Sequence, residues 1–345
     1  MAFKRSRHNP RNVVTPHASV KIGGAVGANS TIEEDLCLLM DFERWVKRFI
    51  MCDLHDYPKT ADVLKDIEKR LKEGRCQGHG ADYIPWIQVH EIPSWGQSSR
   101  IFGLTTRRIH HLFSRLERAY FYIRDWPPNA AYIRDPVRNV TDIREQYALL
   151  PLEVTWEIAR KLGVKHPMYR GKPVVMTTDI VYDTGKGIKR QEHARSIKYA
   201  NELLKERVQE KIEIERLYWN EYRHVDDCLV VTEEDIPFTV VDNIVKVHKC
   251  VDIAARSHLS REHIEGITDE LARQVLAGGA SVAACAAACD KTFGVPPGSA
   301  LLVARHLIVT RQWEIDMTVP YEPRRTVSLL AINLRTARQL MREVR

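Results

Sequence analysis

Apolar residues recur every three to four positions along several stretches of the chain, a spacing that predicts amphipathic helices. The stretches with this pattern are residues 31–51, 61–73 and 107–126, and a longer, charged helix is expected at 199–224. Residues 140–152 and 228–232 favour strands, and residues 173–182 and 193–199 favour a β-hairpin with its turn at 183–187. This order of elements predicts an α/β core, with a mixed sheet and helices on both sides.

After residue 236 the pattern becomes helical. Helices are expected at residues 243–255, 268–277, 281–292 and 298–312, separated by glycine and proline breaks, and residues 313–320 alternate like a short strand. Three helices followed by a β-wing are compatible with an all-α, winged-helix-like module that binds DNA or protein. We therefore expect three parts: a basic arm with an N-terminal helix (1–60), the α/β domain (61–235) and a winged-helix-like C-terminal domain with a basic tail (236–345).

The charge of the chain favours a polyanionic partner. Its 345 residues carry a net charge of +7, with the arm (Lys4 to Lys21) free of acids and four arginines spaced along a predicted helix at 334–345. Basic ends of this kind suit phosphate contacts, which are strong in sum and sensitive to salt. Solvated surface helices are the alternative explanation. No apolar run reaches the roughly 20 residues that a membrane span needs, so no membrane partner is expected.

Cysteine usage indicates a reducing compartment. The seven cysteines stand at irregular spacings that do not suggest zinc ligation, and Cys285 and Cys289, one helical turn apart, fit core packing. The glycine-dense loop at residues 74–80 lacks the Gly-Lys-Ser/Thr of a phosphate-binding loop. A bacterial cytoplasmic protein is the expectation.

Candidate chemistry lies on the predicted hairpin. Side chains alternate along a strand, so Ser196 and Lys198 point to one side while Ile197 points to the other. An acid, Asp179, stands on the facing strand. This layout is typical of restriction-endonuclease-like phosphodiesterases, in which the acid holds a divalent ion and the lysine orients and helps to deprotonate the attacking water. Ser196 is the misfit, because a hydroxyl is a poor metal ligand.

Other polar residues are candidates for the same site. Glu117 lies at the edge of an apolar helix stripe, from which an acid can project into a cleft. Glu145 and Gln146 either touch the site or brace it. The pair His110–His111 is more simply explained by packing than by metal binding.

Several ordered motifs between residues 62 and 235 resemble one family, the TnsA endonuclease subunit of Tn-seven-type transposition systems. The segments that carry the resemblance are Arg70–Trp86, Arg108–Glu117, Asp142–Pro151, Lys165–Pro167, Val175–Asp179 and Lys211–Trp219. They cover about half of the chain, and the helical end is also similar to the C-terminal domain of that family.

The resemblance implies an Mg²⁺-dependent DNA endonuclease with a restriction-enzyme fold. It would cut the 5′ strand at transposon ends, beside a DDE transposase (TnsB-like) and an AAA+ ATPase regulator (TnsC-like). It implies two Mg²⁺ ions, for which Mn²⁺ can substitute. Carried over residue by residue, the catalytic set is Glu117, Asp179 and Lys198, and the metal ligands are Glu117, Asp179, Ser196 and the backbone carbonyl of Ile197. Ser196 stands where the family usually has glutamine.

Two other functions stay open at this stage. One is a nuclease of the same fold that cuts DNA alone, and the other is a degenerate nuclease fold that serves only in assembly. The sequence leaves undetermined the DNA end sequence, the target-selection pathway, the oligomeric state and the partner of the C-terminal domain.

Overall fold

The computed structural model describes residues 60–92, 97–126, 139–185, 187–225, 227–326 and 329–332. The basic arm, the predicted helix at 31–51 and the predicted basic helix at 334–345 lie outside these residues. Within them, no helix is long and apolar enough to cross a membrane.

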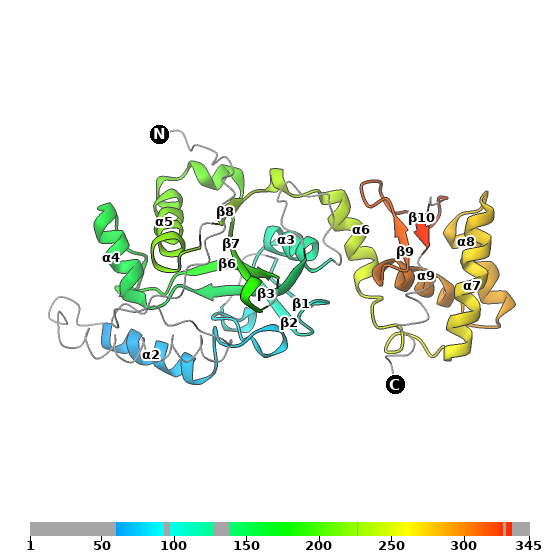
Figure 1. Ribbon diagram of the computed structural model, residues 1–345, viewed down its shortest axis with the longest axis horizontal. Coiled ribbons are helices and arrows are strands. Elements are labelled where there is room, and N and C mark those ends of the chain that lie inside the picture. The colour runs from blue at the N-terminus through cyan, green and yellow to red at the C-terminus, as the bar shows by residue number, and fades with distance from the viewer. Residues whose placement is uncertain are drawn as a thin grey trace.

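A four-stranded mixed sheet forms the centre of the first half of the molecule (Figure 1). Its strands are β3 (Val140–Ala148), β6 (Thr177–Thr184), β7 (Gln191–Ile197) and β8 (Cys228–Val231), in the order β3-β6-β7-β8. The first three are antiparallel neighbours, and β8 runs parallel to β7. The mixed sheet, its hairpin and the last strand confirm the predicted α/β core.

The two faces of this sheet are covered by different helices. Ile180, Tyr182 and Ile197 pack in one cluster with helix α3 (Arg115–Asp125). Val181 and Ala194 pack in a second cluster with α4 (Leu152–Leu162) and α5 (Glu206–Leu217). Alternation along β6 and β7 therefore feeds both layers, as expected for a sheet buried on both sides. Helix α2 (Thr60–Lys72) contributes to a third, smaller cluster with α4.

The single helix predicted at residues 107–126 was wrong at its N-terminal end. Residues Ile109–Leu112 form a strand, β2, paired with β1 (Ser99–Phe102), and Ile109 is exposed instead of lying on a helix face. Helix α3 begins only after Ser114, whose hydroxyl accepts a hydrogen bond from the backbone N–H of Glu117. Ser114 is therefore the N-cap that periodicity alone did not reveal.

Other boundaries also moved. The helix expected at 199–224 is a 3₁₀ turn (Ala200–Leu204), then α5, then a π-helical turn (Tyr218–Tyr222). Helix α4 follows Pro151 where only a proline stop was expected, since proline is tolerated at a helix start. The remaining short elements are 3₁₀ turns and a small hairpin: Gly80–Asp82, Val89–Glu91, Gly187–Lys189, Glu233–Asp235, β4 (Met168–Tyr169) and β5 (Lys172–Pro173).

The C-terminal half is helical, as predicted. It contains α6 (Phe238–His248), α7 (Arg261–Ala277), α8 (Val282–Thr292) and α9 (Ser299–Val309), followed by the antiparallel pair β9 (Trp313–Ile315) and β10 (Leu329–Ile332). Helix α6 starts five residues before the predicted position and α7 seven residues before it, behind the Ser260 cap. Cys285 and Cys289 are buried in the core, which confirms the packing interpretation.

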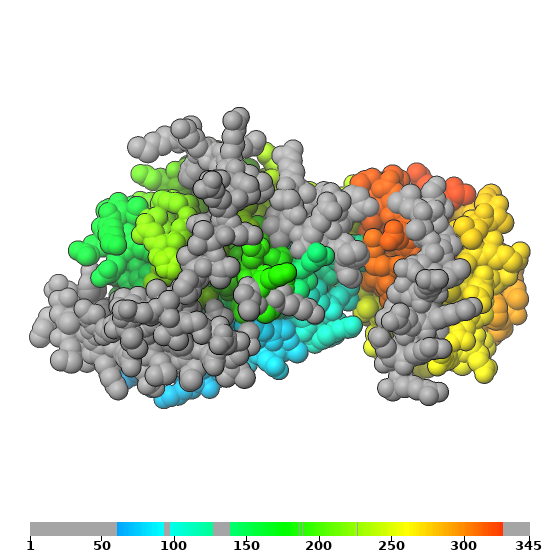
Figure 2. All heavy atoms as spheres, in the orientation of Figure 1, coloured from blue at the N-terminus to red at the C-terminus, as the bar shows by residue number. Residues whose placement is uncertain are grey.

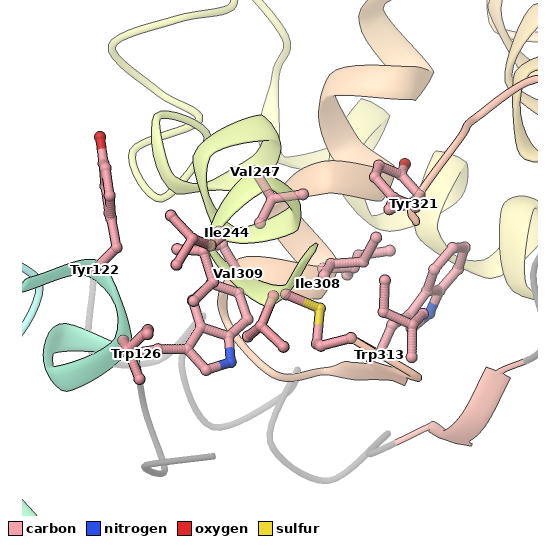
Figure 3. Packing of buried hydrophobic residues seen from close by; sticks show 14 of the residues in the cluster. Tyr122, Trp126, Ile244, Val247, Ile308, Val309, Trp313 and Tyr321 are labelled. Atoms are coloured by element: carbon pink, nitrogen blue, oxygen red, sulfur yellow. The ribbon is translucent and has the colours of Figure 1, made fainter. Parts of the chain in front are cut away.

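One hydrophobic core continues from α3 into the C-terminal half. Tyr122 and Trp126, at the C-terminal end of α3, belong to the same buried cluster as Ile244 and Val247 of α6 and Val309 of α9 (Figure 3). The two halves stand side by side in one elongated molecule (Figure 2). Helix α3 thus packs on the sheet and on the C-terminal half at the same time.

Candidate active site

Asp179 and Lys198 face each other across the hairpin, as the strand alternation predicted. The Asp179 carboxylate accepts hydrogen bonds from Lys198 Nζ at 2.5 Å and from the backbone N–H of Ile197 at 2.6 Å, both on Oδ2. Lys198 Nζ also donates to the carbonyl of Ile197 at 3.1 Å. Their side chains are 13% and 32% exposed, so this pair is the part of the site that solvent and a substrate can reach.

The Lys198 ammonium is stabilised by its acidic neighbours. Burial alone would lower its pKa, but the charge of Asp179 and their hydrogen bond outweigh burial and raise the pKa above the ordinary lysine value. Lys198 is therefore a positively charged hydrogen-bond donor at neutral pH. In this charged state Lys198 cannot accept a proton from water. Of its two predicted roles, it can orient the attacking water but cannot act as the base that deprotonates it.

Glu117 enters the site from the first turn of α3. It is 6% exposed, and its Oε2 atom accepts hydrogen bonds from the backbone N–H of Phe113 at 3.0 Å and from Gln146 Nε2 at 3.3 Å. Burial, followed by the charge of Asp179, raises the pKa of Glu117 to about 7. Ionisation of a carboxyl group with a raised pKa is unfavourable at neutral pH unless a cation lies close to it.

Ser196 does not stand alone on its side of β7. Its hydroxyl donates a hydrogen bond to Glu215 Oε2, and the Thr178 hydroxyl donates to Glu215 Oε1 at 2.6 Å. Trp219 Nε1 in turn donates to Thr178 Oγ1 at 2.8 Å. Ser196 is thereby linked to a carboxylate on α5 that the sequence analysis did not single out.

Glu215 is a further candidate residue for the site. It is buried, and burial, followed by the charge of Asp179, raises its pKa to about 7. The segment Lys211–Trp219 is one of those that resemble the family. It contains two glutamates, Glu213 and Glu215, and the sequence does not indicate which of them faces the core. Glu213 pairs with Arg216 near the surface, and only the fold shows that Glu215 turns inward.

Together these residues form an oxygen-rich site flanked by two layers. Glu117 comes from α3, Glu215 from α5, and Asp179 and the Ile197 carbonyl from the sheet between them. Carboxylate and carbonyl oxygens are the ligands that Mg²⁺ prefers, and Mg²⁺ keeps several waters instead of requiring a closed protein cage. Burial, followed by the charge of Asp179, raises the pKa of Glu117 and of Glu215, and a divalent ion bound beside them would stabilise their ionised forms. The donor set therefore fits Mg²⁺.

A tighter group of potential ligands lies elsewhere and is an ion-pair network. His79, Asp142 and Asp183 form the one trio of His, Cys or acidic residues among the described residues whose ligand atoms all lie within 4.8 Å of one another. Asp183, however, already receives Arg144 Nη2 at 2.6 Å and Arg190 Nε at 2.9 Å. Two guanidinium groups already supply the positive charge that a metal ion would bring. We therefore interpret this trio as part of an ion-pair network that stabilises the fold. The acids of the candidate site are spaced more widely, which leaves room for water ligands.

Glu145, an alternative candidate, braces the fold. It is fully buried and accepts hydrogen bonds from Arg108 (2.6 and 2.8 Å), His110 Nδ1 (2.6 Å) and the backbone N–H of His111 (2.9 Å). These bonds fasten β2 to β3. His110 is thus held by Glu145 and Thr106 on a strand, not on the predicted helix, and neither histidine of the pair contributes to the candidate site.

Comparison with known proteins places these observations in a family. Residues 137–226 match the family model described as "TnsA-like endonuclease N terminal", and residues 235–317 match "TnsA endonuclease C terminal". The chain is 43% identical over 178 residues to the "Transposon Tn7 transposition protein TnsA" of Escherichia coli. That alignment covers 52% of this chain and 60% of the relative, so the chain spans about three fifths of the length of the curated relative it matches.

Proposed function

The chain belongs to the TnsA endonuclease family, and from this premise we propose that it is the Mg²⁺-dependent DNA endonuclease subunit of a heteromeric transposase. In this proposal it cuts the 5′ strand at transposon ends during transposition. The observation that carries the proposal is the convergence of Glu117, Asp179 and Glu215 around the Lys198 ammonium.

The residues that would hold Mg²⁺ are Asp179, Glu117, Glu215 and the carbonyl of Ile197. A bound divalent ion polarises the phosphate and lowers the pKa of a ligated water. Asp179 would be the central ligand, since Ile197 and Lys198 hold its Oδ2 atom and its charge raises the pKa of both flanking glutamates. Ser196 remains a proposed ligand through water, because its hydroxyl is directed at Glu215.

Lys198 stabilises the charge that develops on the scissile phosphate. Its side chain is partly exposed, and Asp179 keeps its amino group in the charged form. The ammonium can therefore donate a hydrogen bond to a phosphate oxygen or to the attacking water. Donors fixed in place before the reaction cost little reorganisation in the transition state. Burial of the two glutamates under α3 and α5 keeps bulk water away from the other side of the site.

The proposal also assigns partners. A DDE transposase (TnsB-like) would act on the 3′ strands, and an AAA+ ATPase (TnsC-like) would regulate both. The helices α7 to α9 and the β9–β10 pair are consistent with a winged-helix module, which we propose contacts DNA or the regulator.

The test is end cleavage by the complete system. The chain, a TnsB-like transposase and a TnsC-like ATPase from the same system are incubated with Mg²⁺ and a plasmid that carries its transposon ends. We expect 5′-strand nicks at the ends with the wild type and none with Asp179→Asn, because the amide cannot replace the central charged ligand. The control is Asp269→Asn, the same change at an exposed position on α7.

Two outcomes would contradict the proposal. Unchanged 5′ cleavage by Asp179→Asn would show that another nuclease acts, and that this chain serves only in assembly. Cleavage of DNA by the chain alone, without either partner, would instead indicate a stand-alone nuclease of the same fold.

A further inference from the structure

Gln146 has an unusual backbone conformation in the middle of a buried strand. It lies in β3 between two registered pairs, Glu145 with Ile180 and Tyr147 with Thr178, and so stands opposite Asp179. Its φ angle is +49°, in the left-handed region that residues other than glycine rarely adopt. Such strain persists only where the surroundings over-determine it, and it is concentrated at functional sites.

Contacts on both sides hold this conformation. The backbone carbonyl of Gln146 accepts a hydrogen bond from the backbone N–H of Trp86 at 3.2 Å. The side chain is buried, with Oε1 accepting from the Thr177 hydroxyl at 3.2 Å and Nε2 donating to Glu117 Oε2 at 3.3 Å. The amide therefore bridges β6, two residues before Asp179, and the glutamate of α3.

This bridge fixes the position of one oxygen of Glu117. Phe113 N–H and the Gln146 amide both donate to Oε2. The Ser114 hydroxyl is a further hydrogen-bond partner of this carboxyl group, so the start of α3 and the strand β3 hold Glu117 together. A carboxylate at position 146 would repel Glu117, and an apolar side chain could make neither hydrogen bond, so an amide is the group that satisfies both neighbours.

We propose that Gln146 is a positioning residue of the nuclease site: its amide, placed by the left-handed backbone, holds Oε2 of Glu117 and so orients this carboxylate for the metal. The inference rests on the proposed function, because it assumes that Glu117 is a ligand. Gln146 belongs to a strand and is neither an acid nor the lysine of the site, yet in this proposal it determines the orientation of Glu117. Residues that orient a ligand in this way typically change metal affinity about 10- to 100-fold when they are lost.

The experiment measures Mn²⁺ binding to the full chain without DNA, by calorimetric titration. The variants are Gln146→Leu, which keeps the size and removes both hydrogen bonds, and Gln146→Gly, which accepts the positive φ and removes the amide. Gln209→Leu is the matched control, since it makes the same chemical change on α5, where the Gln209 amide donates a hydrogen bond to the Leu203 carbonyl. Circular dichroism checks the fold of each variant.

We expect Gln146→Leu and Gln146→Gly to weaken Mn²⁺ binding by roughly tenfold or more and Gln209→Leu to leave it unchanged. Because Gln146 acts through Glu117, adding Gln146→Leu to Glu117→Gln should weaken binding no further. Should the leucine variant fail to fold, the glycine variant decides the question alone.

The outcomes separate this inference from the proposed function. Wild-type affinity in both Gln146 variants, or additive losses in the double variant, would overturn the positioning role while a loss of binding in Asp179→Asn still upheld the metal site. Wild-type binding by Asp179→Asn would overturn the metal site and the inference together.

Discussion

Replacing Glu215 by glutamine should stabilise the metal-free protein at neutral and alkaline pH. Glu215 is buried between Thr178, Ser196 and α5, and burial together with Asp179 raises its pKa from 4.5 to about 7. The folded state therefore binds a proton more tightly than the unfolded chain. Its contribution to stability is complete below about pH 4.5 and is lost as the pH rises through about 7. Glutamine cannot ionise and escapes this loss.

The magnitude follows from the pKa shift. Each pKa unit corresponds to about 1.4 kcal/mol, so Glu215 alone costs up to roughly 3 kcal/mol of unfolding free energy at about pH 8 when no ion is bound. The glutamine amide can keep both hydroxyl contacts, since the Thr178 and Ser196 hydroxyls can rotate to accept or donate. We expect the unfolding free energy of Glu215→Gln to exceed that of the wild type by about 1–3 kcal/mol at about pH 8 and by less than about 1 kcal/mol at about pH 5.

Urea denaturation with a chelator, repeated between about pH 5 and pH 8, measures this difference. Glu206→Gln is the control, because Glu206 is an exposed glutamate at the start of the same helix. Added Mg²⁺ should stabilise the wild type more than Glu215→Gln at about pH 8, since an ion binds the folded, ionised carboxylate. Equal pH profiles of wild type and Glu215→Gln would refute the reasoning.

Three further substitutions test packing in the two halves of the molecule. Arg108→Ala should destabilise the protein by about 3–5 kcal/mol, measured by urea denaturation, because it leaves the buried Glu145 charge without its bidentate partner. Gly266→Ala should cost about 1–3 kcal/mol in the same assay, since its Cβ would come within 2.6 Å of the Phe293 ring, and normal stability would show that the ring can move at no cost. Trp126→Ala should cost about 3–5 kcal/mol by thermal unfolding, and a loss near zero would mean that the core shared by the two halves contributes little.

The central sheet could be predicted because local patterns were strong there. Side chains of the β6–β7 hairpin alternate between the two faces of the sheet, and glycines mark its turn. From this pattern the sequence predicts that Asp179 faces Lys198 across the hairpin, and the two side chains are in contact. The start of α3 was not, because Ile109 and Leu112 fit helical spacing as well as strand alternation. Only the pairing with β1 and the Ser114 cap decide between them.

Glu215 could not be found by periodicity for a different reason. On an amphipathic helix an acid is normally assigned to the solvent face, and α5 is strongly charged along its length. What turns Glu215 inward is a set of tertiary contacts, the hydroxyls of Thr178 and Ser196. The hydroxyl of Ser196, a poor metal ligand by itself, donates a hydrogen bond that joins this carboxylate to the sheet.

The packing of α3 has a consequence for how such proteins can be recombined. The helix that carries Glu117 at its first turn ends in Tyr122 and Trp126, which are buried against α6 and α9. An exchange of C-terminal halves between two relatives would therefore have to match the shapes of these aromatic rings as well as the join in the backbone. The α/β half and the C-terminal half are expected to be inherited together, and a cut of the chain between them would expose these aromatic side chains.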